Sequence, residues 1–341
     1  MSKKLRWGAL STAAIGVKKV LPAMQQGRYS TVVAIASRDP SKARQAAAIL
    51  GIPTAYGSYE ELLADPAIDA VYNPLPNHLH VPWTIKAAEA GKHVLCEKPI
   101  STTVAEARTL LEVRERTGVK MGEAFMVLCT PQWLRLRELL KEGRIGALRS
   151  VLGFFSYFNA DPANIRNQVE CGGGALLDIG CYLTLASRFA FASEPARVIA
   201  CIDRDPRMRT DRLTSAILDF PAGQSVFTCS TQMVYSQRLH FLGTRGRIEM
   251  EIPVSAPFDR PTRLLIDTGS DLFGGGMTVE TLPICNHYTL QGDAFSKAVL
   301  EDGAVPVPLE DAIRNMAVID ALFHSADSGK WETPQSCDFP V

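Results

Sequence analysis

Over the first 125 residues, short apolar runs alternate with segments of helical periodicity. The run STVVAIAS at residues 30–37 is rich in β-branched residues, which is typical of a buried strand. The helical pattern after it has Asp39 as N-cap, Pro40 at the first helical position and Gly51 as C-cap. Further strands are predicted at residues 68–76 and 93–97, each followed by a helical pattern. This alternation predicts βαβ units and a doubly wound parallel sheet, the Rossmann type of α/β domain.

After residue 125 the pattern changes to long strand-like runs. They cover residues 149–158, 196–203, 213–220, 225–235, 238–244 and 246–252. Pro221 with Gly223, and the segment 243–246, predict hairpin turns between them. Helical patterns are found at residues 131–143, 174–192, 291–302 and 309–326. We therefore predict a C-terminal α+β domain with a mostly antiparallel open sheet, and divide the chain into residues 1–125 and 126–341.

Composition excludes several classes of partner. The 36 Lys and Arg residues balance 36 Asp and Glu residues, so no net charge favours a nucleic acid or an anionic membrane. The 8 cysteines are scattered without a CxxC pair, which is typical of reduced thiols in a cytoplasmic protein. We find no run that approaches the roughly 20 apolar residues of a membrane span.

The segment LRWGALSTAAIGVKKV at residues 5–20 has two competing interpretations. Basic residues before an uncharged run resemble a secretory signal, but two lysines end the run, which is rich in Gly, Ser and Thr. The alternative is a dinucleotide-binding turn between a strand and a helix, which needs small residues at three positions. Ser11, Ala13 and Gly16 occupy those positions, although a generic strand-helix turn would look the same.

If this turn binds a dinucleotide, Ser11, Thr12, Ala13 and Ile15 are the residues that contact the cofactor. The Ser11 hydroxyl offers an additional donor to the phosphates. Because Ser11 and Ala13 carry Cβ atoms, we expect neither residue to adopt a positive φ.

The end of the second predicted strand favours NADP over NAD. NAD-binding domains usually place Asp or Glu there to hold the ribose diol, whereas this chain has Ser37 followed by Arg38. A guanidinium is a planar, permanently charged donor suited to a 2′-phosphate, and Lys42 offers a second cation one turn into the helix. A solvated loop arginine is the alternative, and NAD stays possible.

The strand at residues 93–97 leads directly into Lys98 and Pro99. This order places the Glu97 carboxylate and the Lys98 amine at the carboxyl edge of the sheet, where ligands of open α/β folds bind. Pro99 restricts Lys98 to an extended backbone. From the residues alone, a surface salt bridge is the better interpretation.

Five segments together resemble the glucose-fructose oxidoreductase, inositol dehydrogenase and rhizopine catabolism family (Gfo/Idh/MocA). They are NPLPNHLH (73–80), GKHVLCEKPIS (91–101), GEAFM (122–126), GGGALLDIGCYLTLASRF (172–189) and PLEDAIRNMAVIDALFHSA (308–326). The resemblance implies a Rossmann domain followed by a domain whose open sheet often mediates homo-oligomerisation. It also implies hydride transfer between a nicotinamide and a carbon of a sugar, a polyol or a related alcohol.

The resemblance also assigns residues around the nicotinamide. It implies that Lys98 contacts both the nicotinamide ribose and the reacting oxygen, with Glu97 beside it. Leu75, Asn77 and His80 are implied to line the nicotinamide end of the cofactor.

The second-domain motif departs from the common family pattern, because Tyr182 stands where many members carry histidine. This departure resembles dihydrodiol dehydrogenases, xylose dehydrogenases and sugar ketoreductases. Asp178 and Tyr182 are four residues apart, so on a helix they share one face. We predict Tyr182 as the acid/base, Lys98 as its electrostatic support, and Asp178 as a residue that holds a substrate hydroxyl or orients Lys98. Arg166 is a further candidate for the substrate pocket, and a buried core tyrosine is the alternative for Tyr182.

The predicted function is therefore an NADP-dependent oxidoreductase acting on a sugar or a related cyclic polyol. One alternative is trans-dihydrodiol dehydrogenase activity, and another is a non-catalytic regulator that binds NADP and a sugar. Lys98, Asp178 and Tyr182 favour an enzyme, because all three are retained. We predict no metal site, because His78 and His80 have no third ligand near them in the sequence.

Overall fold

The computed structural model describes residues 3–337 and 339. The chain divides into two compact units, and both are discontinuous in sequence. Unit 1 consists of Met1–Cys129 and Asn286–Ile313, and unit 2 of Thr130–Cys285 and Arg314–Val341. The first boundary thus lies close to the one expected after residue 125. The return of residues 286–313 to unit 1 differs from the expected single division of the chain.

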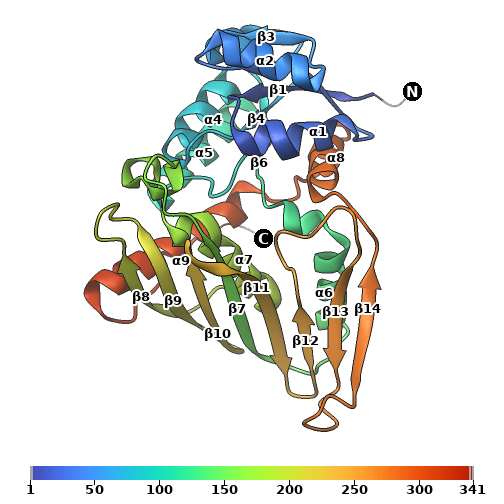
Figure 1. Cartoon of the computed structure of the whole chain (residues 1–341), viewed down its shortest axis with the longest axis vertical. Helices are drawn as coiled ribbons and strands as arrows, with labels where there is room; N and C mark the ends of the chain where they lie inside the picture. The colour runs from blue at the N-terminus through green and yellow to red at the C-terminus, as the bar shows by residue number, and fades with distance from the viewer. Residues whose placement is uncertain (1–2, 338, 340–341) are drawn as a thin grey trace. The chain divides into compact units, whose positions relative to one another are not determined.

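Unit 1 contains a six-stranded parallel sheet in the order β3-β2-β1-β4-β5-β6. Figure 1 labels β3, β1, β4 and β6 of this sheet. Its strands are β1 (Leu5–Leu10), β2 (Ser30–Ala36), β3 (Thr54–Tyr56), β4 (Ala70–Asn73), β5 (His93–Cys96) and β6 (Met121–Glu123). Its helices are α1 (Leu21–Gln25), α2 (Pro40–Leu50), α3 (Tyr59–Ala64), α4 (His80–Glu89), α5 (Val104–Thr117) and α8 (His287–Leu300). This strand order is that of doubly wound dinucleotide-binding folds, so the predicted Rossmann architecture is confirmed.

Local capping explains why the helices of unit 1 begin and end where the sequence predicts. The Asp39 side chain accepts hydrogen bonds from the backbone N–H groups of Ser41 and Lys42 at the start of α2. Gly51 ends α2 with a φ of 64°, a left-handed conformation that glycine adopts without a steric penalty. These contacts involve only residues close in sequence, and they are therefore predictable.

A contact distant in sequence explains why α8 belongs to unit 1. Trp7 on β1 is fully buried, and its Nε1 donates to Ser296 Oγ on α8 at 2.9 Å. The Trp7 and Phe295 ring centroids lie 5.4 Å apart. The helix thus covers the central strand of the sheet, and its apolar face completes the core of unit 1.

Unit 2 contains an eight-stranded sheet in the order β14-β13-β12-β11-β7-β10-β9-β8. Its strands are β7 (Leu148–Phe158), β8 (Arg197–Arg204), β9 (Asp211–Phe220), β10 (Gly223–Ser230), β11 (Gln232–Gly243), β12 (Arg247–Met250), β13 (Thr262–Asp267) and β14 (Met277–Leu282). The β7–β10 pair is parallel and the other neighbours are antiparallel, which confirms the mostly antiparallel sheet. The predicted hairpins join β9 to β10 and β11 to β12.

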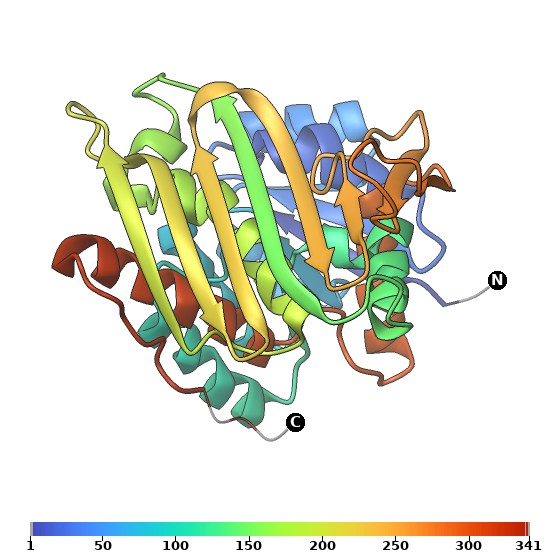
Figure 2. The same ribbon diagram turned by 90° about the horizontal axis from the view of Figure 1, so that it is seen from below.

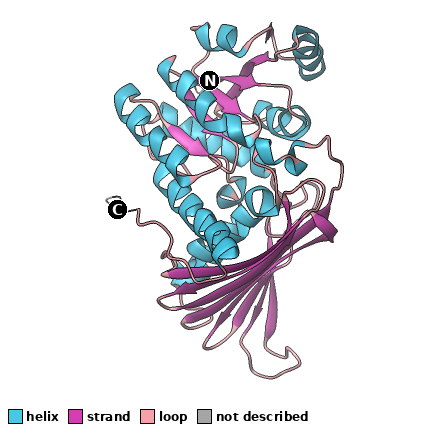
Figure 3. Cartoon of the chain, turned by 90° about the vertical axis from the view of Figure 1, so that its left-hand side faces the viewer, coloured by secondary structure: helices cyan, strands magenta, loops and turns pink. Residues whose placement is uncertain are grey.

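The helices of unit 2 lie on one face of this sheet, as Figures 2 and 3 show. They are α6 (Pro131–Lys141), α7 (Cys181–Phe191) and most of α9 (Leu309–Ser328). The opposite face, called the outer face below, is the one turned to the viewer in Figure 2.

Two details of unit 2 differ from the sequence expectations. The run 225–235, predicted as one strand, is divided at Thr231, whose N–H donates to the Arg212 carbonyl and so turns the chain from β10 into β11.

The segment Val169–Phe191 is long and apolar enough to cross a membrane, with a mean hydropathy of 1.2 over its apolar window. The expectation that no run has this length and composition is therefore wrong. Because 72% of that window is buried inside the fold, the segment has the character of a core helix.

Candidate active site

The loop after β1 turns sharply into a helical segment that begins with a π-helical turn, Gly16–Val20. Ser11 has a φ of 86°, which corrects the expectation that it avoids positive φ, whereas Ala13 does avoid it. The Ser11 N–H donates to the Ala36 carbonyl at 3.0 Å, and Ser11 Oγ accepts from the Ala13 N–H at 3.2 Å. These two hydrogen bonds stabilise the strained backbone of Ser11. Within the turn, the Ser11 hydroxyl takes the place of a backbone carbonyl as the acceptor of the Ala13 N–H. Ser11, Thr12, Ala13 and Ile15 are all partly exposed at the carboxyl end of β1.

The residues after β2 form a cationic surface. Ser37 is buried, while Arg38 and Lys42 are exposed. Asp39 Oδ1 accepts from the Ser41 hydroxyl at 2.6 Å and caps α2, so the carboxylate nearest to the end of β2 serves the helix. Burial raises the pKa of Tyr59, and the neighbouring Arg38 guanidinium opposes this shift. Arg38 and Lys42 supply two positive charges, and the Asp39 carboxylate is engaged in the cap of α2. This arrangement fits the 2′-phosphate of NADP better than the free ribose diol of NAD.

At the end of β5, Glu97 and Lys98 lie at the carboxyl edge of the sheet of unit 1. The Tyr72 hydroxyl donates to Glu97 Oε1 at 2.6 Å, and the Lys98 N–H donates to Glu97 Oε2 at 3.3 Å. Burial raises the pKa of Tyr72, and the Glu97 charge raises it further. The pKa of Tyr288 on α8 is raised by the same two causes. The protonated Tyr72 hydroxyl therefore stabilises the Glu97 carboxylate beside Lys98, and the Glu97 charge helps to keep Tyr288 protonated. Sequence reasoning missed both tyrosines, because Tyr72 lies inside an apolar strand and Tyr288 is distant in sequence.

The structure places His80 inside unit 1, where it is 1% exposed. Its Nδ1 lies 2.7 Å from the Pro99 carbonyl oxygen, and its Nε2 lies 2.7 Å from the Leu75 carbonyl oxygen. Burial lowers the pKa of His80 to about 4. His80 thus joins the loop after β4 to the Lys98–Pro99 turn and directs both ring nitrogens into the protein. Leu75 is also buried, whereas Asn77 is partly exposed on the same loop.

In unit 2, the predicted residues Asp178 and Arg166 lie in one cluster. Asp178 Oδ2 accepts from Arg166 Nε at 3.1 Å and from the Tyr157 hydroxyl at 2.5 Å. Asp178 lies in a π-helical turn, Leu176–Gly180, that leads directly into α7. The predicted helix is therefore present but starts with a wider turn than the α-helix assumed for the spacing of Asp178 and Tyr182.

Sequence reasoning missed Tyr157. The alternation along β7 buries Val151 and Phe155, so Tyr157 also points to the helix-covered face. Burial raises the pKa of Tyr157, and the neighbouring Asp178 raises it further, which keeps its hydroxyl protonated as a donor. Tyr157 follows the same alternation as the inward-facing residues Val151 and Phe155, and this alternation is the sequence signal from which it could have been found.

Tyr182 is 5% exposed, and its ring centroid lies 6.2 Å from that of Phe155. Most of its ring therefore packs in the core of unit 2. The predicted residues Ser11, Arg38, Glu97 and Lys98 belong to unit 1, and Arg166, Asp178 and Tyr182 belong to unit 2.

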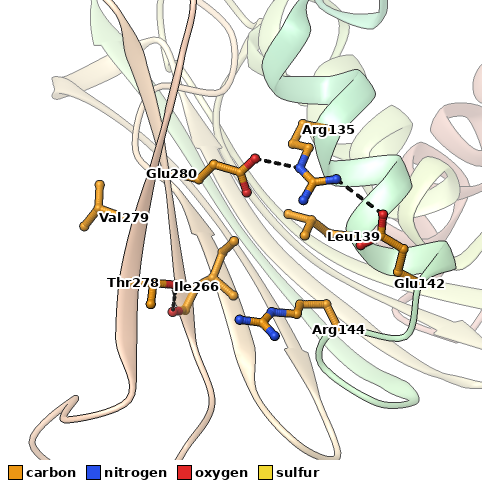
Figure 4. A pocket seen from close by; sticks show the side chains of 8 residues that line it. All are labelled: Arg135, Leu139, Glu142, Arg144, Ile266, Thr278, Val279 and Glu280. Atoms are coloured by element: carbon orange, nitrogen blue, oxygen red, sulfur yellow. Dashed lines mark hydrogen bonds and ion pairs between the residues drawn. The ribbon is translucent and has the colours of Figure 1, made fainter.

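Two hollows of unit 2 lie away from these residues. The first, about 380 Å³, lies between α6 and the β13–β14 pair, where Arg135 Nε donates to Glu280 at 2.7 Å (Figure 4). The second, about 660 Å³, is lined by residues of β11 and β13 and of the segment between β12 and β13. Within residues 3–337 and 339, no group of three His, Cys, Asp or Glu side chains could hold a metal ion.

Comparison with protein families gives matches for most of the chain. Residues 8–125 match the oxidoreductase family with an NAD-binding Rossmann fold, and residues 133–249 match the GFO/IDH/MocA C-terminal domain. The chain is 45% identical to oxidoreductase ORF334 of Rhizobium meliloti, over 96% of this chain and 99% of that protein. It is 38% identical to a D-xylose 1-dehydrogenase (NADP(+)) of Haloferax volcanii, over 95% of this chain and 98% of that enzyme.

A solved structure with the same fold is that of KijD10, a 3-ketoreductase from Actinomadura kijaniata in complex with NADP and TDP-benzene. It superposes with a TM-score of 0.87 at 29% identity, covering 95% of this chain and 98% of KijD10. The resemblance noted in the sequence is thereby confirmed over both units. The chain belongs to the GFO/IDH/MocA family of oxidoreductases.

Proposed function

We propose that this protein is an NADP-dependent oxidoreductase that transfers a hydride between the nicotinamide and a carbon of a sugar or a related cyclic polyol. The observation that carries the cofactor choice is the exposed pair Arg38 and Lys42 after β2, with Asp39 turned into the cap of α2. The NADP-dependent xylose dehydrogenase and the NADP complex of KijD10 support the same choice.

Lys98 and Tyr182 are the catalytic residues of this proposal. Solved KijD10 variants include one with a lysine changed to alanine and one with a tyrosine changed to phenylalanine. Those two positions lie as far apart along KijD10 as Lys98 and Tyr182 lie along this chain. The bound cofactor supplies the hydride. In the direction of reduction, Tyr182 donates a proton to the substrate oxygen, and the positive charge of Lys98 stabilises the negative charge that develops on it.

The cluster of Asp178, Arg166 and Tyr157 supports a hydroxyl-rich substrate. Two donors aim at Asp178 Oδ2, which fixes the carboxylate in one orientation. A carboxylate held in this way accepts a hydrogen bond from a sugar hydroxyl with a defined geometry. In this proposal Asp178 orients the substrate and does not exchange the proton of the reaction.

The outer face of unit 2 supports a homo-oligomer. Leu152, Val226 and Ile217 are neighbours in register on β7, β10 and β9, and they are exposed by 41%, 40% and 36%. Contiguous apolar side chains on an open sheet favour burial against a second copy. Light scattering of Val226→Glu against the wild type tests this, with a lower molecular mass as the expected result and an unchanged mass as the contrary one.

The proposed activity is tested by following NADPH at 340 nm in both directions. The substrate panel contains aldoses, keto-sugars, anhydro-sugars and aromatic dihydrodiols. We expect turnover with a sugar, and turnover only with dihydrodiols would favour the alternative dehydrogenase. Tight NADP binding with no turnover on any member of the panel would instead identify a non-catalytic regulator.

A further inference from the structure

A buried carboxylate lies beneath the start of the helical segment that carries Asp178. Asp211, the first residue of β9, is 2% exposed. Its Oδ2 accepts from the backbone N–H of Leu176 at 2.6 Å and from Thr214 Oγ1 at 3.2 Å. Leu176 is the first residue of the π-helical turn that contains Asp178. The carboxylate therefore satisfies an N–H group that this first turn leaves without a helical partner.

The glycine run before this turn is shaped to fit the carboxylate. Gly174 has a φ of 122°, and a Cβ at that position would overlap Asp211 Oδ1. A Cβ at Gly173 would overlap the Arg166 carbonyl oxygen. The two glycines thus allow the backbone to pass between Asp211 on one side and the backbone of Arg166, a partner of Asp178, on the other.

Several titratable groups surround Asp211. Burial raises the pKa of Asp211 to about 6, while its bonds to Leu176 and Thr214 and the charge of Arg204 lower it. Asp211 in turn raises the pKa of Cys229 on β10 and of Tyr157 on β7, and Asp178 affects the same two groups. A neutral amide could accept the same N–H without the cost of a buried charge. A costly buried charge next to candidate site residues is typical of a functional position.

We propose that Asp211 is a positioning residue of the active site, whose carboxylate fixes the first turn of the segment bearing Asp178 and Tyr182. It touches neither substrate nor cofactor and acts through the Leu176 N–H and the Gly174 backbone. This inference rests on the proposed function, because it assigns Asp178 and Tyr182 to the site. Protonation of Asp211 weakens the hydrogen bond to Leu176 and releases the turn.

The test measures kcat and KM of the full-length enzyme between pH 5 and pH 8 with the best sugar of the panel. In the wild type we expect kcat to fall as the pH is lowered through about 6. Asp211→Asn imitates the protonated carboxylate. It should reduce kcat at pH 7.5 by about tenfold and abolish this acid limb, with KM for NADP unchanged. Asp203→Asn, the same change at a carboxylate that is 51% exposed on β8, is the matched control and should keep the wild-type profile.

A second variant keeps the inference testable if Asp211→Asn fails to fold. Thr214→Val removes one donor to Asp211 but leaves its charge, so the acid limb of kcat should move to higher pH. An unmoved limb in Thr214→Val, or a wild-type profile in Asp211→Asn, would overturn the inference. Wild-type turnover in Tyr182→Phe and Lys98→Met would instead refute the proposed function itself, and the two failures are therefore distinguishable.

Discussion

Replacing Asp211 by asparagine should stabilise the protein at neutral pH, although the same change is expected to slow the enzyme. The carboxylate has a pKa of about 6 in the folded protein against an ordinary value of 3.8. At about 1.4 kcal/mol for each pH unit, this difference corresponds to roughly 3 kcal/mol of destabilisation whenever the group is ionised. Asparagine keeps the shape and an acceptor for the Leu176 N–H, and it removes the buried charge.

The pH dependence of this effect has a definite sign. Because the folded pKa lies above the unfolded value, the folded state binds the proton more tightly. The contribution of Asp211 to stability is therefore fully present below about pH 4 and is lost as the pH rises through about 6. The wild type should gain more stability than Asp211→Asn when the pH is lowered from 7.5 to 5.

Urea unfolding at pH 7.5 and at pH 5 measures this difference for the wild type, Asp211→Asn and the control Asp203→Asn. The expected result is a higher unfolding free energy for Asp211→Asn at pH 7.5, by up to roughly 3 kcal/mol, and about half that gap at pH 5. A lower stability of Asp211→Asn at pH 7.5, or an equal gap at both pH values, would refute the reasoning.

Three further predictions concern Arg38 after β2, Ser11 after β1 and the glycine Gly174. Arg38→Ala should raise the dissociation constant of NADP by about 10-fold to 100-fold and leave that of NAD unchanged, as titration calorimetry can measure; equal losses for both cofactors would contradict the 2′-phosphate contact. Ser11→Gly should be tolerated because φ is 86°, whereas Ser11→Val should lower the unfolding free energy by about 1–2 kcal/mol; equal stability of the two variants would argue against a strained turn. Gly174→Ala should destabilise the protein far more than Gly51→Ala, which has a positive φ but open space around it, and similar melting temperatures would contradict the close contact with Asp211.

Capping and periodicity were sufficient to predict most elements of unit 1. The ends of α2 depend on Asp39 and Gly51, which lie next to the helix in sequence. The edge strand β3 was not predicted, because it has only three residues and none of them is buried. A short strand of this kind is formed by pairing with β2, which the local sequence does not encode.

Long-range packing decided the features that sequence reasoning missed. Trp7 and Ser296 are 289 positions apart, yet their hydrogen bond explains why α8 belongs to unit 1. The strands β13 and β14 are recognisable only through their pairing with β12 and with each other.

Sequence reasoning named candidate residues of the site but not the residues that hold them in place. Asp178 and Arg166 were named from the sequence, and one ion pair joins them. Tyr157 on β7 and Asp211 on β9 reach the same segment through long-range contacts, and only the inward phase of Tyr157 could be read from the sequence. The positive φ of Ser11 was missed because the expectation considered only its Cβ atom and not the hydrogen bond that its hydroxyl accepts from the Ala13 N–H.

The central claim is that Tyr182 transfers the proton and Lys98 stabilises the developing negative charge in an NADP-dependent sugar oxidoreductase. Its most direct test is single-turnover oxidation of enzyme-bound NADPH by the best keto-sugar, measured for the wild type, Lys98→Met and Tyr182→Phe at 340 nm. We predict that NADPH still binds and that both variants react at least about 100-fold more slowly than the wild type. Wild-type rates in either variant, with the cofactor bound, would contradict the account.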